Sequence, residues 1–260
     1  MKKVKLFLYE VNHLNELSTY NNFSEFIKKN IIKFFVKKLY IKADLIAGNS
    51  KELSLDLSKF TNKKVYTLYN PCFFRIKRPK IVNKFTNNIK ILNVSRLENQ
   101  KDHFTLLKAI RFSKIKNKIQ LILVGDGTNK NKILQFINKY KIKTKIYSNH
   151  TKLNVFYSTS DLFVSSSLYE GLPTTMVEAA SYHLPIISSN FKSGSKEILS
   201  NGRGGFIFKI KDYQHLAKLI EQFYFSPKLF FKKAKYCSRV IKKFSYKKNI
   251  YLFHKLLKLL

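Results

Sequence analysis

The sequence predicts an α/β protein whose larger part is a doubly wound parallel sheet. From residue 89 onward, short apolar runs alternate with segments that show apolar residues at helical spacing. Each short run is apolar throughout, which is typical of strands in a parallel sheet that helices cover on both faces. The 260 residues, 45% of them hydrophobic, suffice for one large domain or two modest ones with a buried core.

The expected elements before residue 89 are fewer. Residues 23–42 place lysines between apolar residues at helical spacing, which predicts a helix. A short strand at 43–50, a helix at 51–60 and a strand at 64–71 are expected to follow. Residues 72–88 are basic and carry no apolar pattern, so they suggest a linker or a crossover between domains.

The elements after residue 88 form a regular series. Strands are expected at 89–97, 119–127, 144–148, 161–167, 184–190 and 204–209. Helices are expected at 102–114, 129–141, 152–160, 173–183 and 195–202, the last of them stopped by Gly202 in the left-handed conformation. Residues 212–260 are predicted to be helical and are rich in lysine.

The strong positive charge does not by itself predict nucleic-acid binding. The chain has 50 basic and 15 acidic residues, but only six of the basic residues are arginine and the lysines are spread over its whole length. Neither zinc-finger spacing nor an aromatic RNA-binding segment occurs, so we expect no specific nucleic-acid partner. A diffuse positive field would suit an anionic membrane surface or a phosphate-bearing substrate, and a codon bias toward lysine would produce it equally well.

Several other classes of protein are not expected. Cys72 and Cys237 give no disulfide framework, which fits a reducing, cytoplasmic compartment. The first residues lack the cleavage site of a signal peptide, and no run of ~18 apolar residues could span a membrane. Metal-binding spacings are absent and the six histidines are scattered, so we expect no metal. The chain contains no Gly-x-Ser-x-Gly sequence, so a serine hydrolase is not favoured.

Two carboxylates distinguish residues 166–189. Glu170 precedes Gly171 and Pro173 in the loop after an expected strand, and Glu178 lies one and a half turns into the helix that follows. Ligands of parallel sheets bind where strands end and helices begin, and a helix N-terminus attracts anions. A carboxylate there could hold a diol such as a ribose. Equally, both could be ordinary surface carboxylates near a helix start.

Two further segments end strands of the same expected sheet. Arg96 and Lys101 lie five positions apart, just before a helix, where two cations could clamp a diphosphate. Ordinary surface basicity is the alternative. Gly125 and Gly127 form a turn from strand to helix that resembles part of a dinucleotide-binding fingerprint without its full glycine spacing. Most such turns are structural.

Taken together, these segments resemble the C-terminal half of a GT-B glycosyltransferase of the large retaining family 4. The matching pieces are SRLENQKDHFTLLKAI (95–110), LILVGDG (121–127), EGLPTTMVE (170–178) and FKSGSKEILSNGRGGFIF (191–208). Upstream, ADLIAGNSKELSLDL (43–57) and VYTLYNP (65–71) resemble the end of that family's N-terminal domain, and FSYKKNIYLFHKLL (244–257) resembles its final helix, which crosses back. Order and spacing match over residues 89–210, and the resemblance covers nearly the whole chain.

The resemblance implies a GT-B fold with one complete Rossmann-like domain, built on a doubly wound parallel sheet, and a partial N-terminal Rossmann-like domain. It divides the chain into a partial, acceptor-side domain at 1–70, an interdomain linker at 71–88, a nucleotide-sugar donor-binding domain at 89–225 and helices at 226–260 that cross back to the first domain. Much of the usual N-terminal domain, with its glycine-rich loop and most of the acceptor site, has no counterpart in the sequence.

The resemblance also implies roles for single residues. Arg96 and Lys101 would hold the donor diphosphate, Glu178 the nucleotide ribose, and Glu170 would face the transferred sugar. The turn from Gly125 to Gly127 would lie close to the nucleotide. The backbone of the loop and helix start would meet the sugar and the phosphates at Gly171, Leu172, Pro173, Thr174 and Thr175. His13 would approach the donor sugar, although Glu10 or Asn12 could align equally well and His13 could be a surface histidine.

The implied function is that of a metal-independent, retaining glycosyltransferase with a nucleotide sugar as co-substrate and no other cofactor. It would transfer a sugar to a glycan or lipid-linked acceptor in surface polysaccharide or lipopolysaccharide synthesis, at the inner face of the plasma membrane. For the carboxylate pair alone, a glycosidase acid and nucleophile are the alternative. For the chain, the alternatives are an inactive nucleotide-sugar-binding relative or half of a split enzyme that a partner chain completes.

Overall fold

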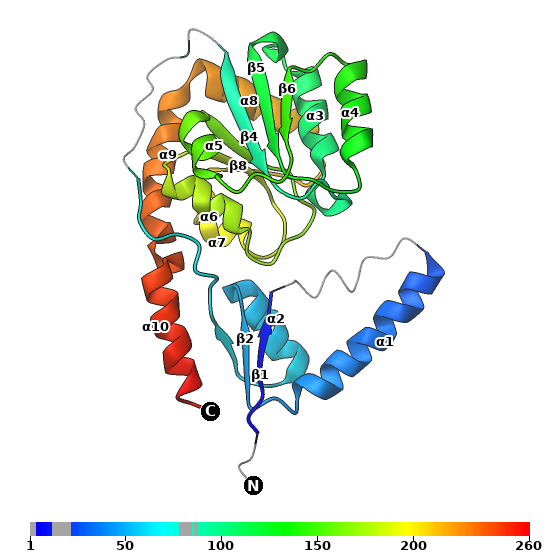
Figure 1. The fold of residues 1–260 in the computed structure, drawn as a ribbon, viewed down its shortest axis with the longest axis vertical. Coiled ribbons are helices and arrows are strands. Elements are labelled where there is room, and N and C mark those ends of the chain that lie inside the picture. The colour runs from blue at the N-terminus through cyan, green and yellow to red at the C-terminus, as the bar shows by residue number, and fades with distance from the viewer. Residues whose placement is uncertain (1–3, 12–21, 78–84, 86–87) are drawn as a thin grey trace.

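The structure is a computed structural model that describes residues 4–11, 22–77, 85 and 88–260 (Figure 1). Its strands form two separate parallel sheets. The smaller sheet contains β1 (Phe7–Glu10), β2 (Leu45–Gly48) and β3 (Val65–Thr67) in that order. The larger sheet has the order β6-β5-β4-β7-β8-β9, with β4 (Ile89–Val94), β5 (Ile119–Val124), β6 (Thr144–Tyr147), β7 (Leu162–Ser165), β8 (Ile186–Ser189) and β9 (Phe206–Phe208).

The larger sheet confirms the doubly wound α/β fold. The chain enters at β4 in the middle, builds outward through β5 to β6, and then returns to the other side of β4 for β7 to β9. All of its strand pairs are parallel. Such a sheet has a switch point between β4 and β7, where the loops after the strands diverge and leave a crevice for a ligand.

Two hydrophobic cores lie on the two faces of this sheet. On one face, α3 (His103–Phe112), α4 (Lys130–Lys139) and α8 (Tyr213–Phe225) pack on side chains such as Ile91 and Leu121. On the other face, α5 (Asn154–Thr159), α6 (Thr174–Ser181), α7 (Ser195–Ile198) and α9 (Pro227–Val240) pack on side chains such as Leu92 and Ile122. Successive residues of a strand point to opposite faces, so uniformly apolar strands feed both cores.

The smaller sheet carries α1 (Phe23–Tyr40) and α2 (Lys51–Thr61) and has a core of its own. Leu45, Ala47 and Leu68 pack there against Leu256 of α10 (Tyr246–Leu257), so the C-terminal helix returns to the smaller sheet, as Figure 1 shows. Short 3₁₀ turns at Asn99–Lys101, Lys116–Lys118 and Ile241–Phe244 complete the described elements.

Some sequence-based bounds are wrong. The helix expected at 195–202 ends at Ile198, because Ser200, Asn201 and Gly202 all have positive φ angles of 49° to 88° that no α-helix tolerates. The strand expected at 64–71 ends at Thr67, and β1 has no counterpart among the elements expected. Among the described residues, no helix combines the length and the apolar character that crossing a membrane requires. The four proposed segment limits stay predictions.

Candidate functional site

Three adjoining cavities lie at the carboxyl ends of the central strands of the larger sheet. The inner cavity, about 220 Å³, lies between the end of β4 and the start of α6 and is lined by Arg96, Lys101 and Glu170, among others. The middle cavity, about 510 Å³, shares Val94 and Ser95 with it and extends past the loop after β5. The outer cavity, about 640 Å³, shares Thr151 and Leu153 with the middle one. The middle cavity therefore adjoins both of the others.

The inner cavity contains a tight ion pair. Lys101 Nζ lies 2.5 Å from Glu170 Oε1, and the Ser167 hydroxyl donates to the same oxygen over 2.7 Å. The side chains of Lys101 and Glu170 are only 14% and 11% exposed. Arg96, by contrast, is exposed, and the hydrogen bond that its guanidinium donates to Gln100 Oε1 is long at 3.4 Å. The structure therefore brings the predicted cations and Glu170 together, with Lys101 already neutralised by the carboxylate.

Backbone and side-chain hydrogen bonds fasten the two loops that carry this pair. The Ser166 hydroxyl donates to the carbonyls of Lys101 and Asp102 over 3.0 and 2.9 Å. Gln100 exchanges two bonds with the loop after β7: its carbonyl accepts from the Leu168 amide, and its side-chain amide donates to the Tyr169 carbonyl, each over 2.8 Å. These hydrogen bonds hold the loops after β4 and β7 together, and the loops in turn position Lys101 and Glu170.

The start of α6 forms the wall opposite the cations. Pro173 precedes the helix without a side-chain cap, and Leu172, Thr174 and Thr175 line the inner cavity with it. The first amides of a helix have no partner within the helix and attract an anion. Gly171 is required for a different reason, because a Cβ there would lie 1.9 Å from the Val11 carbonyl oxygen.

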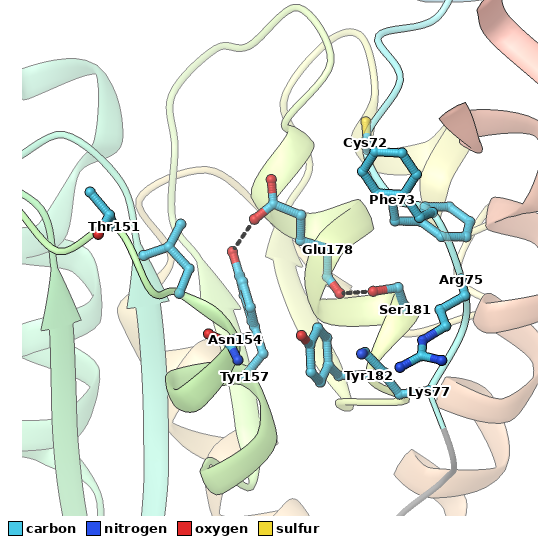
Figure 2. A pocket seen from close by; sticks show the side chains of 12 residues that line it. Cys72, Phe73, Arg75, Lys77, Thr151, Asn154, Tyr157, Glu178, Ser181 and Tyr182 are labelled. Atoms are coloured by element: carbon cyan, nitrogen blue, oxygen red, sulfur yellow. Dashed lines mark hydrogen bonds between the residues drawn. The ribbon is translucent and has the colours of Figure 1, made fainter. Parts of the chain in front are cut away.

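Glu178 lies in the outer cavity rather than beside Glu170. Its Oε2 accepts a 2.8 Å hydrogen bond from the Tyr157 hydroxyl, and burial raises the pKa of the Glu178 carboxyl above its ordinary value. Figure 2 shows Glu178 between Tyr157 on one side and Cys72 on the linker that forms the facing wall. The two carboxylates thus do not flank one bond, and this separation does not support a glycosidase pair.

The glycine turn lines the middle cavity and is structurally required. Gly125 has a φ of 147°, and a Cβ on it would come within 2.0 Å of the Ser95 carbonyl oxygen. A Cβ on Gly127 would lie 2.7 Å from the Leu97 carbonyl oxygen, and Gly127 is not among the residues that line the cavity. Gly125 therefore lets the loops after β4 and β5 approach each other beside the cavity, and the role of Gly127 toward a nucleotide stays a prediction.

Sequence reasoning missed a buried network behind Ser95, which lines both the inner and the middle cavity. The Ser95 hydroxyl donates to Asn93 Oδ1 over 2.7 Å and lies 3.0 Å from Nε2 of His103, a histidine that is 2% exposed. Because Ser95 has one proton and Asn93 Oδ1 only accepts, His103 Nε2 must donate to Ser95. Burial lowers the pKa of His103 to about 4, which agrees with this neutral tautomer. The sequence signalled His103 only through its position at the start of an expected helix.

The structure does not test two of the sequence predictions, the role of His13 and the absence of a metal. His13 falls outside the described residues. Across the described part of the chain, no group of three or more His, Cys, Asp or Glu side chains could hold a metal ion, and metal independence stays a prediction.

Two parallel α/β units, a ligand crevice at the strand ends of the larger one and a C-terminal helix that crosses back define the GT-B class of glycosyltransferases. The chain belongs to the family of group 1 glycosyl transferases, whose family model matches residues 74–244. This membership confirms the family resemblance at the level of group 1 GT-B enzymes. Retention of configuration and membership of family 4 stay predictions.

Relatives with known names are similar over most of this chain. An uncharacterized glycosyltransferase of Methanocaldococcus jannaschii is 30% identical over 73% of the chain and 53% of its own length. The amylovoran biosynthesis glycosyltransferase AmsD of Erwinia amylovora is 31% identical over 74% and 53%. An N-acetylgalactosaminyltransferase of Campylobacter jejuni, named for a diphospho-undecaprenol acceptor, is 25% identical over 84% and 61%. The chain thus spans between half and two thirds of these relatives.

Solved structures show the same fold at lower identity. Anabaena HepE in complex with UDP-glucose superposes with a TM-score of 0.82 at 17% identity, over 98% of this chain and 72% of HepE. TarM superposes with a TM-score of 0.79 at 19% identity, over 99% of this chain and 50% of TarM. The likeness extends to both α/β units and the crossing helix.

Proposed function

We propose that this chain binds a nucleoside diphosphate sugar in the three connected cavities and serves as the donor half of a retaining glycosyltransferase. The observation that carries the proposal is the inner cavity, where Arg96 and Lys101 face the start of α6. Two cations and a helix N-terminus around about 220 Å³ make a site for a compact, multiply charged anion such as a diphosphate.

The connected cavities suit the other parts of such a donor. The transferred sugar would lie beside Glu170, whose ion pair with Lys101 fixes the carboxylate for hydroxyl groups of the sugar. The base would enter the middle cavity beside Gly125. The ribose joins the base to the diphosphate. It would reach Glu178 along α6, whose start lines the inner cavity and whose Glu178 lines the outer one, and would exchange for or share the Tyr157 hydrogen bond.

The chemistry assigned to these groups is electrostatic. As the bond between sugar and diphosphate breaks, negative charge grows on the leaving phosphate, and Arg96, Lys101 and the α6 amides would stabilise it. Preorganised donors of this kind accelerate reactions by roughly 10²–10³ each. Glu170 would stabilise positive charge on the sugar ring, and the leaving phosphate would accept the proton of the acceptor hydroxyl on the same face. These steps use no metal.

The names of relatives suggest the acceptor class. Two Campylobacter relatives are named for diphospho-undecaprenol-linked glycans, and one Erwinia relative is named for amylovoran biosynthesis. A glycan or lipid-linked acceptor in surface polysaccharide synthesis is therefore proposed. The second candidate function is nucleotide-sugar binding without transfer, or transfer only with a partner chain. The residues that carry the proposal all concern donor binding, so they support this second candidate as well.

Calorimetric titration of the purified chain with UDP, GDP, ADP and their sugars tests donor binding. We expect saturable binding of one diphosphate. Arg96→Ala should weaken it about 10- to 100-fold, the value of a hydrogen bond between charged groups. Glu178→Ala should weaken the binding of nucleotides that contain ribose but leave the binding of inorganic diphosphate unchanged.

Lys132→Ala is the matched control for charge, since Lys132 is exposed on α4, away from the cavities. Its titration should equal that of the unchanged chain. If no diphosphate binds to the folded protein, or if Arg96→Ala and Lys132→Ala behave alike, the donor-site proposal is wrong. Binding without transfer to any lipid-linked acceptor would favour the second candidate.

A further inference from the structure

Helix α1 turns its apolar side away from the protein. Five of its large apolar residues, Phe23, Ile27, Ile31, Phe34 and Phe35, are between 46% and 75% exposed, and no residue of this fully described helix is buried. At 3.6 residues per turn these five side chains fall within about one third of the helix circumference. They form one continuous strip along the helix, here called the outer strip of α1.

The opposite side of α1 is the less exposed one, and it is mainly polar. It carries Glu25, Lys29, Lys33 and Tyr40 together with Val36, all of which are partly covered. The Tyr40 hydroxyl donates to Glu10 Oε2 over 2.6 Å, and Lys29 lies 3.8 Å from Glu25. A helix on the surface of a protein normally faces inward with its apolar side. This helix has the reverse orientation, so its outer strip is available to something outside the described fold.

The surroundings of the outer strip are positively charged. Lys28, Lys37 and Lys38 are exposed on its borders or within it, and Lys38 Nζ lies 4.6 Å from the centre of the Phe34 ring. The one acidic residue of α1, Glu25, lies on the opposite side. The outward surface of α1 therefore combines large apolar side chains with cations and contains no carboxylate of the helix itself.

This combination favours a lipid surface over a protein partner. Lysine is depleted from the centres of protein interfaces. Helices that lie in the headgroup region of a bilayer combine phenylalanine with lysines, whose long side chains reach back to the lipid phosphates. Figure 1 shows α1 projecting from the rest of the molecule, so the whole outer strip could lie flat on a surface.

We infer that α1 docks the protein on an anionic membrane, with the outer strip inserted among the headgroups and Lys28, Lys37 and Lys38 paired with lipid phosphates. The excess of 35 positive charges on the whole chain adds long-range attraction to the same surface. This docking requires no nucleotide, so it can be tested independently of donor binding.

The experiment is flotation of the full chain with vesicles of phosphatidylcholine alone and of phosphatidylcholine with phosphatidylglycerol. We expect binding to the anionic vesicles and release at high salt. Changing Lys28, Lys37 and Lys38 together to Gln should weaken partitioning roughly a hundredfold, at about fivefold per lysine near an anionic surface. Phe34→Ser with Phe35→Ser should also release the protein, because the apolar contact is lost.

Matched controls separate α1 from general charge and general hydrophobicity. Lys132, Lys145 and Lys218 changed to Gln remove the same charge from exposed sites on the larger unit, and Phe225→Ser removes a phenylalanine that is 67% exposed. The inference would be overturned if the α1 three-lysine variant and its three-lysine control lost vesicle binding equally. It would also be overturned if the unchanged chain showed no preference for anionic vesicles. A lipid-free dimer that only the Phe34 and Phe35 changes dissociate, with vesicle binding unaffected, would assign the outer strip to a second copy instead.

Discussion

Glu197 joins the two α/β units, and its replacement gives the sharpest prediction on stability. The Glu197 carboxylate accepts from the Tyr69 hydroxyl, from the Lys51 amide at the start of α2 over 3.0 Å and from Lys243 Nζ over 3.3 Å. Beside it, Glu52 accepts from the Ser193 amide over 2.6 Å. One side chain of α7 that is 11% exposed therefore ties the smaller sheet, the segment after it and the turn before α10 to the larger unit.

We expect Glu197→Gln to lower the free energy of unfolding by about 2 to 4 kcal/mol. A hydrogen bond to a charged acceptor contributes roughly 1.5–3 kcal/mol, and the more exposed pair with Lys243 adds less than about 1 kcal/mol. Glutamine keeps the size of the side chain but turns an N–H toward one of the donors. Tyr69→Phe removes only the hydroxyl of a residue that is 8% exposed.

A double-mutant cycle isolates the contact. The free energy of unfolding of the unchanged chain, both single variants and the double variant is measured by urea titration, followed by far-UV circular dichroism because the chain has no tryptophan. We expect a coupling energy of about 1 to 2 kcal/mol between Tyr69 and Glu197. If the two single changes in unfolding free energy add up to that of the double variant within about 0.5 kcal/mol, the assigned contact between Tyr69 and Glu197 is refuted, because distant, independent sites behave in that way.

Two further changes test the loops of the site. Gly171→Ala should cost about 1–3 kcal/mol and separate the segment after β1 from the loop before α6, because its Cβ would meet the Val11 carbonyl oxygen; unchanged thermal unfolding would contradict this contact. His103→Gln should remove a pH dependence. Burial lowers the pKa of His103 from 6.5 to about 4, so the unfolded chain takes up the proton first. Stability should therefore fall by about 3 kcal/mol between pH 6.5 and 4. The effect of His103 is the difference in unfolding free energy between the unchanged chain and His103→Gln, followed over pH. The raised pKa values of Glu178 and Asp102 act in the opposite direction, but they do so in both proteins and cancel in this difference. A flat difference would contradict the buried, neutral state.

The order of the elements and the meeting of Arg96, Lys101 and Glu170 could be predicted from the sequence. Both follow from local rules, since each strand is a continuous apolar run and the carboxyl ends of parallel strands share one edge of the sheet. The end of α7 could not be predicted, because Ser200 and Asn201 adopt positive φ angles that their residue types permit but do not require.

Other features depend on contacts between distant segments. Helical spacing in residues 23–42 predicted α1, but the pattern does not say which side of the helix faces the protein, and the polar side is the covered one. Spacing likewise placed Glu170 and Glu178 on one loop-helix unit. They line different cavities, because Glu178 lies a turn farther along α6, where it accepts a hydrogen bond from Tyr157 of a helix before β7.

The Lys101–Glu170 pair explains how carboxylates can belong to an anion-binding site in so basic a protein. Either side chain alone, almost covered in the inner cavity, would be an uncompensated charge. Together they are neutral, so before a ligand arrives the positive potential of the cavity comes from Arg96 and the α6 amides. A diphosphate would then bind to Lys101 without removing Glu170, since an ammonium group has three N–H donors and the pair uses one. The carboxylate would keep its second oxygen for sugar hydroxyls. In the proposed site the pair would thus set the spacing between phosphate and sugar. Lys101→Met leaves Glu170 uncompensated, so it should weaken binding of the sugar-bearing donor more than binding of the bare diphosphate. Calorimetry on the two ligands would show the reverse if Lys101 served the phosphate alone.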